Sequence, residues 1–252
     1  MTDWLVHPPR WLGNGWLTLR HVEAMLDGLL YTSLLSLAVI ATGTLLGCAL
    51  GIARHQARAR WLAWPLAALH NGVRNVPLLV QVLFWYFGIG ALLPESWMLW
   101  LNTPRVLLQL GDWALPWPSF ELLAAWWALS LYATAFIAGD IRSGLNAVPP
   151  GQWEAARASG MRQWQVLRYV VLPQAWRTAW PPVLGSYLNT LKNTSLTMAI
   201  GVMELSYRAR QIDAETLLTF QSFALASVLY VLLIVLVQRL LRPRQRAAWG
   251  AA

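Results

Sequence analysis

Five apolar blocks dominate the 252-residue sequence, and each is long enough to cross a lipid bilayer. An α-helix needs roughly 20 predominantly apolar residues to span about 30 Å of hydrocarbon. Charge is correspondingly scarce, because 12% of the residues are charged, against about 25% in a typical soluble domain. The sequence therefore predicts an all-α membrane protein with about five transmembrane helices, at residues 28–52, 66–93, 121–141, 182–203 and 221–241.

The net charge of +8 is distributed unevenly over the segments between these blocks. With five spans, the segments on one side hold twelve arginines and two acids, Asp140 and Glu154. The segments on the other side hold five arginines and nine acids. Because cytoplasmic loops carry the excess of basic residues, we expect the N-terminus outside and the C-terminus inside. The basic charge is thus a topology signal and gives no reason to expect nucleic-acid binding.

The pattern divides the chain into three predicted regions. Residues 1–27 mix Trp, Pro and charge and are expected to lie along the outer interface, residues 28–241 form the transmembrane domain, and residues 242–252 form an inner tail. The first block is too long for a cleavable signal peptide, so none is expected. Cys48 is the single cysteine, and the four histidines lack metal-ligand spacing, so neither an intrachain disulfide nor a metal site is predicted.

The longest inner loop, at about residues 142–180, is predicted to be ordered. Gln152–Ser159 is expected to form a short helix, and Gly160 to end it in a left-handed conformation. A second helix is expected over Met161–Val171, stopping at Pro173. Two short helices around a glycine, with basic residues on the inner face, are typical of a surface that docks on a cytoplasmic partner.

The sequence of this loop resembles the EAA loop of ABC importer permeases. The resemblance is carried by Glu154-Ala155-Ala156, by Gly160 and by Leu172-Pro173, with the spacing and topology of that family. The chain is similar more specifically to the polar amino-acid branch, through residues 74–81, 130–137 and 192–196. One departure is Gly139-Asp140, where relatives commonly have a small residue followed by Glu, so no role is carried over to Asp140.

The resemblance implies a type I ABC importer permease fold in a multi-pass protein of the bacterial inner membrane. It implies partners: a second permease subunit, identical or related, two cytoplasmic ATPase subunits that bind the loop, and a periplasmic substrate-binding protein. It implies a polar amino acid as substrate, with no cofactor on this chain and ATP used by the ATPase. Independently, Lys192 is the single lysine and lies inside a block, so no Gly-rich phosphate loop ending in Lys is present.

Two cations fall towards the middle of predicted spans, Arg74 in the second and Lys192 in the fourth. Ionisable groups in a membrane are costly and usually face a cavity or a partner. Either cation could meet the α-carboxylate of an amino acid, or form a structural ion pair. Pro77 is expected to bend or unwind the second span. The predicted pathway residues are Arg74, Asn75, Pro77, Gln81, Lys192, Asn193, Thr194 and Ser195, although the polar ones are equally suited to interhelical hydrogen bonds.

Other functions fit the sequence less well. A channel or secondary transporter would leave the ordered inner loop unexplained, and its coupling-ion site would need acids inside the spans, where Asp140 is the marginal candidate. A membrane enzyme would need a convergent catalytic constellation, which the dispersed histidines do not provide. The alternative that remains open is the same importer with another small zwitterion as cargo, such as an opine or a sulfur compound.

Overall fold

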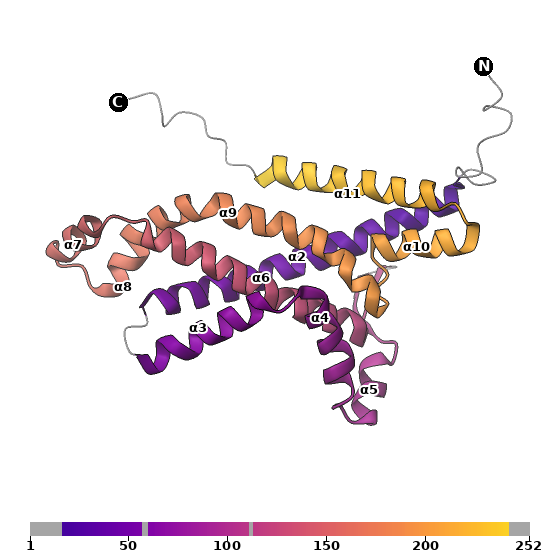
Figure 1. The fold of residues 1–252 in the computed structure, drawn as a ribbon, viewed down its shortest axis with the longest axis horizontal. Helices are drawn as coiled ribbons and strands as arrows, with labels where there is room; N and C mark the ends of the chain where they lie inside the picture. Colours follow the sequence, from indigo (N-terminus) through magenta and orange to yellow (C-terminus); the bar gives the residue numbers. More distant parts are fainter. Residues whose placement is uncertain (1–16, 57–59, 111–112, 242–252) are drawn as a thin grey trace, which may run out of the picture.

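The computed structural model describes residues 17–56, 60–110 and 113–241. Its long helices lie side by side in an elongated bundle (Figure 1). The length of the bundle is formed by α2 (Leu19–Gln56), α6 (Phe120–Asn146), α9 (Leu172–Asn193) and α11 (Thr219–Leu241). The shorter elements are α3 (Arg60–Asn75), α4 (Leu78–Leu83), η2 (Phe84–Gly88), α5 (Glu95–Asn102), β1 (Val106–Leu110), β2 (Trp113–Pro116), α7 (Pro150–Ala158), α8 (Gln163–Gln165), η3 (Val166–Val171), η4 (Thr194–Ile200) and α10 (Leu205–Thr216).

The predicted helical boundaries hold only in part. Among the described residues, α2, α6 and α11 are long and apolar enough to cross a membrane. α2 begins at Leu19, inside the segment predicted to be interfacial, while residues 1–16 and the tail at 242–252 lie outside the described residues. The blocks at 66–93 and 182–203 are not continuous α-helices, so the count of five spans stays a prediction.

α2 and α6 approach closely along a stripe of small residues on α2. A Cβ atom added to Gly47 would lie 2.8 Å from side-chain atoms of Ile137, and one added to Gly43 would lie 2.9 Å from Cβ of Ala133. Gly51 likewise faces the backbone of α6. Small residues at four-residue spacing allow helix backbones to pack this closely in membranes. α2 and α6 therefore form one tightly packed pair.

The second predicted span is broken at Pro77, as expected. α3 ends at Asn75 and α4 begins at Leu78, with Pro77 in an extended conformation at ψ 134°. Proline lacks an amide donor and disfavours the helical conformation in the preceding residue. The buried Gln81 donates its side-chain amide to the carbonyl oxygens of Val73 and Val76, at 2.8 and 2.9 Å. Gln81 therefore satisfies the backbone groups that the break leaves without helical partners.

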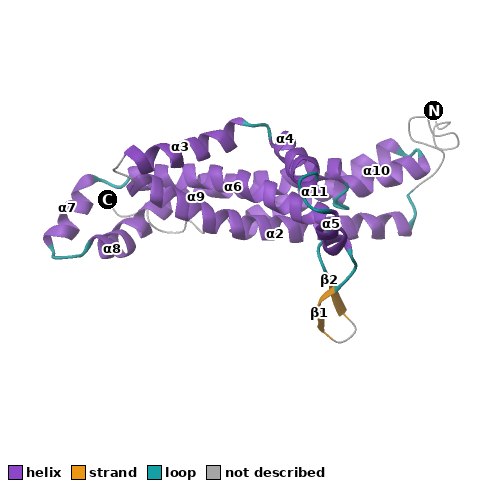
Figure 2. Ribbon diagram, turned by 90° about the horizontal axis from the view of Figure 1, so that it is seen from below, coloured by secondary structure: helices purple, strands orange, loops and turns teal. Residues whose placement is uncertain are grey.

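The segment at 94–119 does not cross the bundle but branches from it (Figure 2). It contains α5 and an antiparallel hairpin in which Gln109 of β1 lies opposite Ala114 of β2. The hairpin returns onto α5, because the Trp117 amide donates to the Arg105 carbonyl at 2.7 Å and the Arg105 guanidinium lies over the Trp100 ring. The sequence predicted a short interfacial element here but no strands.

The fourth block also changes conformation along its length. α9 contains Pro181 and Pro182, continues into the 3₁₀ helix η4, and stops at Gly201, whose φ is +89°. Glycine adopts this left-handed conformation without steric cost. The chain then turns into α10. The short helices consequently occupy opposite ends of the bundle, α7 and α8 at one end and α10 at the other (Figures 1 and 2).

Candidate functional site

The loop between α6 and α9, at residues 147–171, is shorter than the predicted 142–180 because both flanking helices extend into that range. We call it the α6–α9 loop. α7 has Pro150 in its first turn, where the missing amide hydrogen costs nothing. It ends at Gly160, with φ +79°, and the amide of Met161 donates back to the carbonyl of Ala156 at 3.3 Å. This left-handed helix end confirms the conformation predicted for Gly160.

The second half of the loop differs from its prediction. Helical turns run from Gln163 through η3 into α9 without a break, so the helix does not stop at Pro173. Pro173 instead lies at the junction where the π-helical turns of η3 pass into α9. The side-chain oxygen of Gln165 accepts a hydrogen bond from the Arg162 amide at 2.8 Å and fixes the start of α8. The loop is therefore anchored directly to a helix of the bundle.

The residues of the EAA-like motif do not share one environment. Glu154 and Ala155 are exposed, whereas Ala156 is 6% exposed and packs in the hydrophobic core. Glu154 is the fifth residue of α7, beyond the first turn in which the helix dipole favours an acid. Ala155 therefore leaves room for a partner to approach α7 closely, while Ala156 holds α7 onto the bundle.

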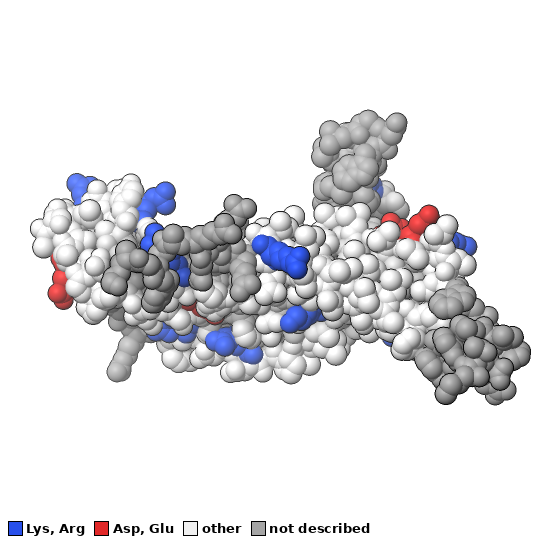
Figure 3. Space-filling model, turned by 90° about the horizontal axis from the view of Figure 1, so that it is seen from above, with Lys and Arg blue, Asp and Glu red and all other residues white. Residues whose placement is uncertain are grey.

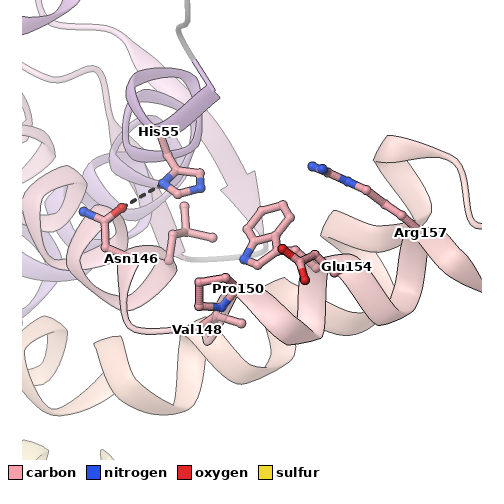
Figure 4. Close-up of a pocket in the computed structure, with 8 residues that line it drawn as sticks. His55, Asn146, Val148, Pro150, Glu154 and Arg157 are labelled. Atoms are coloured by element: carbon pink, nitrogen blue, oxygen red, sulfur yellow. Dashed lines mark hydrogen bonds between the residues drawn. The ribbon is translucent and has the colours of Figure 1, made fainter.

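A surface pocket of about 410 Å³ lies where α7 meets the ends of α2 and α6 (Figure 4). The His55 ring stacks on Trp153, with centroids 5.6 Å apart, and the His55 Nδ1 atom lies 2.9 Å from Oδ1 of Asn146. In Figure 3 several basic side chains, drawn in blue, lie at this end of the molecule, at the left of the view. The pocket is lined by His55, Leu145, Asn146, Val148, Pro150, Trp153, Glu154 and Arg157.

The two predicted pathway cations lie on different helices that both pack on α6. Arg74 is in the last turn of α3, and its guanidinium carbon lies 4.7 Å from the centre of the Phe136 ring. Lys192 is exposed in the last turn of α9. Asp140 of α6 accepts a hydrogen bond from Ser186 of α9 at 2.8 Å, and the Arg74 charge acts on this carboxylate. Arg74 and Lys192 are thus both exposed, but Arg74 also has structural partners in Phe136 and the Asp140 carboxylate.

The polar pathway candidates divide in the same way. The Gln81 side chain is hydrogen-bonded to backbone carbonyls at the helix break. Thr194 is fully buried, and its hydroxyl donates to the Leu191 carbonyl at 2.8 Å. Ser195 is partly exposed and donates to the Lys192 carbonyl at 2.7 Å. Asn193 is partly exposed and Asn75 exposed. Asn193 and Ser195, close to Lys192, and Asn75, at the end of α3, are therefore the polar candidates open to a ligand.

Sequence reasoning missed the role of Glu204, which it counted only as an acid of the outer segments. Glu204 is fully buried, and its carboxylate accepts hydrogen bonds from the amides of Ser206 and Tyr207, both at 2.9 Å, as the N-cap of α10. It also accepts from the Tyr230 hydroxyl of α11 at 2.6 Å and lies 3.5 Å from the Thr32 hydroxyl of α2. The position of this acid three residues after Gly201 is a signal that could have found the cap, but nothing in the sequence indicates its burial.

Comparisons with known proteins identify the family of the chain. The family model described as "Binding-protein-dependent transport system inner membrane component" matches residues 43–247. One relative is the probable glutamine ABC transporter permease protein GlnM of Bacillus subtilis (strain 168), which is 30% identical over 210 residues. The alignment covers 83% of this chain and 86% of GlnM. Another relative is the octopine transport system permease protein OccM of Rhizobium radiobacter, which is 32% identical over 230 residues. The alignment covers 90% of this chain and 86% of OccM.

The fold has a counterpart among solved structures. A chain in the crystal structure of an amino acid ABC transporter with histidines matches with a TM-score of 0.72 and 25% identity, over 88% of this chain and 93% of that one. The fold is that of a type I ABC importer permease, and the apolar helices make this a multi-pass membrane protein. The family model and the two relatives each cover well over half of the sequence. The chain therefore belongs to the family of binding-protein-dependent transport system inner membrane components, the permease subunits of ABC transporters.

Proposed function

We propose that this chain forms the translocation pathway of an importer for polar L-amino acids in the inner membrane of a bacterium. The observation that carries the substrate class is the set of relatives, which includes a glutamine permease at 30% identity and a glutamate/aspartate import permease at 31%. A second cargo class is favoured by one specific relative, the octopine permease at 32% identity. An opine or another small zwitterion, such as a sulfur compound, is therefore the alternative substrate.

The proposed machine contains further subunits: a second permease, two cytoplasmic ATPases and a periplasmic binding protein that delivers the substrate. The α6–α9 loop supports the docking of an ATPase. Its first helix presents Glu154 and Ala155 to solvent, is sharply ended by Gly160, and is held to the bundle by Ala156. With the N-terminus outside, this loop faces the cytoplasm. The chain itself is proposed to bind no cofactor, and ATP is used by the partner.

Lys192 is the residue that we propose to contact the substrate. Its ammonium group is exposed in the last turn of α9, next to the partly exposed Asn193 and Ser195. A carboxylate forms strong, charge-assisted hydrogen bonds with such a cation. Arg74 is also a proposed pathway residue, but its proposed role is to shape the wall of the pathway, because its guanidinium stacks on Phe136.

The direct test is uptake by proteoliposomes that contain this chain with its ATPase, any partner permease and its binding protein. A panel of labelled amino acids, together with octopine, is offered with ATP inside the vesicles. ATP-dependent uptake of one amino-acid class supports the proposal. Uptake of octopine alone, or of no amino acid by a complex that hydrolyses ATP, would refute the amino-acid substrate and leave the family assignment intact.

Substitution of Lys192 tests its assigned role. Lys192→Ala is expected to lower uptake, whereas Lys192→Arg, which keeps the positive charge, retains part of it. Arg210→Gln, at an exposed position on α10, serves as the control for loss of one cation. Membrane abundance and ATPase binding are measured in parallel and are expected to stay at the wild-type level. Unchanged transport kinetics in Lys192→Ala would remove Lys192 from the substrate site.

A further inference from the structure

An aromatic contact joins the end of α2 to the α6–α9 loop, and no sequence motif predicted it. His55 is the penultimate residue of α2, and its ring stacks on Trp153 of α7 with centroids 5.6 Å apart and an interplanar angle of 26°. Figure 4 shows His55 close to Asn146 and facing the start of α7. An offset stack of this kind stabilises one relative orientation of the two rings. The contact therefore links the direction of α7 to the position of α2.

A hydrogen bond fixes the His55 ring from the other side. The Nδ1 atom of His55 lies 2.9 Å from Oδ1 of Asn146, the last residue of α6. An amide oxygen only accepts hydrogen bonds, so His55 carries its proton on Nδ1 and donates it to Asn146. The ring is thus held by α6 and presented to α7, and three elements meet at one side chain.

The surroundings of the stack are open. The 410 Å³ pocket and a second hollow of about 210 Å³ both include His55, Trp153 and Arg157 in their walls. The second hollow is completed by Gln56 and Gln163. α7 packs on η3 and buries Ala156 in the core, while open space flanks its stack with the end of α2. His55 therefore adds a contact that ties α7 to α2 as well as to η3 and the core.

α2 extends this contact to the far end of the molecule. It is locked to α6 by the glycine stripe, and near its other end a Cβ atom at Gly28 would lie 2.9 Å from Cα of Leu205 in α10. Thr32 also accepts a hydrogen bond from the Leu205 amide at 3.1 Å. From Thr32 to His55 the helix is about 35 Å long at 1.5 Å per residue. It offers a path from α7 to α10 that does not pass through α9.

We propose that His55 is a positioning residue for coupling, which orients α7 through Trp153 and passes its movement to α2. The residue touches no substrate and acts through α7. This inference rests on the proposed docking of an ATPase on α7, while the orientation of α7 by His55 can be tested without a partner. When ATPase closure moves α7, the stack makes α2 move with it. Without the stack, α7 follows the ATPase alone, and hydrolysis is transmitted less completely to the spans.

The first test measures α7 in the purified full-length chain, without any partner. His55→Ala is expected to increase amide hydrogen exchange in residues 150–158, because the orientation of α7 is no longer fixed. His55→Phe keeps a ring against Trp153 and is expected to restore most of the protection. Gln56→Ala, next to His55 in the wall of the second hollow, is the matched control and is expected to behave as wild type. Wild-type exchange in His55→Ala would overturn the proposal whatever the protein transports.

The second test measures substrate molecules transported per ATP hydrolysed in proteoliposomes. For His55→Ala the ratio is expected to fall about threefold to tenfold, the range that loss of one aromatic contact supports, while ATP hydrolysis continues. His55→Phe is expected to recover most of the ratio, which a mere loss of folded protein would not allow. An unchanged ratio in His55→Ala, or an equal fall in Gln56→Ala, would contradict the positioning role.

Discussion

At one end of the bundle, Glu204 is fully buried and accepts hydrogen bonds from the Ser206 and Tyr207 amides and from the Tyr230 hydroxyl, whereas at the other end Glu154 stands exposed on α7. We call these the α10 end and the α7 end. α10 buries Leu205, Ala209 and Ile212 among its twelve residues, whereas α7 buries Ala156 alone among its nine. The α10 end is stabilised from within the chain, and the α7 end leaves its surface for a partner.

The difference has a physical cause. A buried carboxylate is costly unless hydrogen bonds compensate for its lost hydration, so the groups around Glu204 are held in one arrangement. In an exposed helix such as α7, few contacts within the chain stabilise one orientation of the helix over another. Its orientation can therefore be set by another subunit. Substitutions at the α10 end should change stability, and substitutions at the α7 end should change coupling at nearly constant stability.

The largest expected effect on stability is that of Glu204→Ala. We expect the free energy of unfolding to fall by roughly 2 to 4 kcal/mol, because loss of an N-cap costs about 1 kcal/mol and buried donors left without acceptors cost about 1 to 3 kcal/mol. Thermal unfolding of the purified chain in detergent measures the change. Glu215→Ala, at an exposed position of the same helix, is the control. A wild-type melting temperature for Glu204→Ala would show that the buried carboxylate does not organise this end.

Tyr230→Phe should have a smaller effect at the same end. It removes the 2.6 Å hydrogen bond to Glu204 but leaves the ring in place, and a hydrogen bond to a charged group contributes about 1.5 to 3 kcal/mol. In the double variant with Glu204→Ala, the two losses should sum to less than their separate values, because both remove the same contact. Strict additivity in the melting experiment would count against a shared network.

Gly160→Asp moves the comparison to the α7 end. The φ of +79° disfavours any residue with a side chain, at a cost of about 1 kcal/mol, so the loss of stability should be modest. Transport and ATPase assembly should nevertheless fail, because α7 no longer ends sharply. Gly151→Asp places the same side chain on α7 at a position with open space and no left-handed backbone. Normal uptake by Gly160→Asp would be incompatible with a coupling role for this helix end.

The smallest effect is expected for Gln174→Ala. The Gln174 amide donates to the side-chain oxygen of Gln152 at 3.2 Å and to the Val170 carbonyl at 2.9 Å, and so connects α9 to α7 at an exposed site. Its loss should cost about 0.5 kcal/mol, as for an ordinary solvent-accessible hydrogen bond. Uptake should remain within about twofold of wild type, since one exposed hydrogen bond carries little energy. A loss of uptake as complete as that expected for Gly160→Asp would mean that coupling runs mainly through α9.

Features dictated by local backbone chemistry could be predicted from the sequence. The close approach at Gly43 and Gly47, the break at Pro77 and the left-handed conformation of Gly160 all follow from what glycine and proline permit. The EAA-like motif likewise indicated the family that the comparisons then matched. These are signals that a short stretch of sequence carries by itself.

Features set by distant contacts could not be predicted. The burial of Glu204 depends on Thr32 and Tyr230, which are 172 and 26 residues away in the sequence. The hydrogen bonds of Gln81 to Val73 and Val76 are local, but they depend on how the chain folds around Pro77, and the pathway role of Gln81 stays a prediction. The helix continues through Pro173 at the junction of the π-helical η3 with α9, a change of helical register that spacing alone did not reveal. The roles predicted for Lys192 and Arg74 stay predictions.

The most direct measurement is cross-linking of the permease to its ATPase in the assembled complex. Cys48 is first replaced by Ser, and a single cysteine is then introduced either at exposed Ala155 on α7 or at exposed Glu215 on α10. A short bifunctional reagent should join the ATPase to the cysteine at 155 and not to the one at 215. Cross-linking at 215, or none at 155 in a complex that still co-purifies, would contradict the assignment of the α7 end as the docking surface.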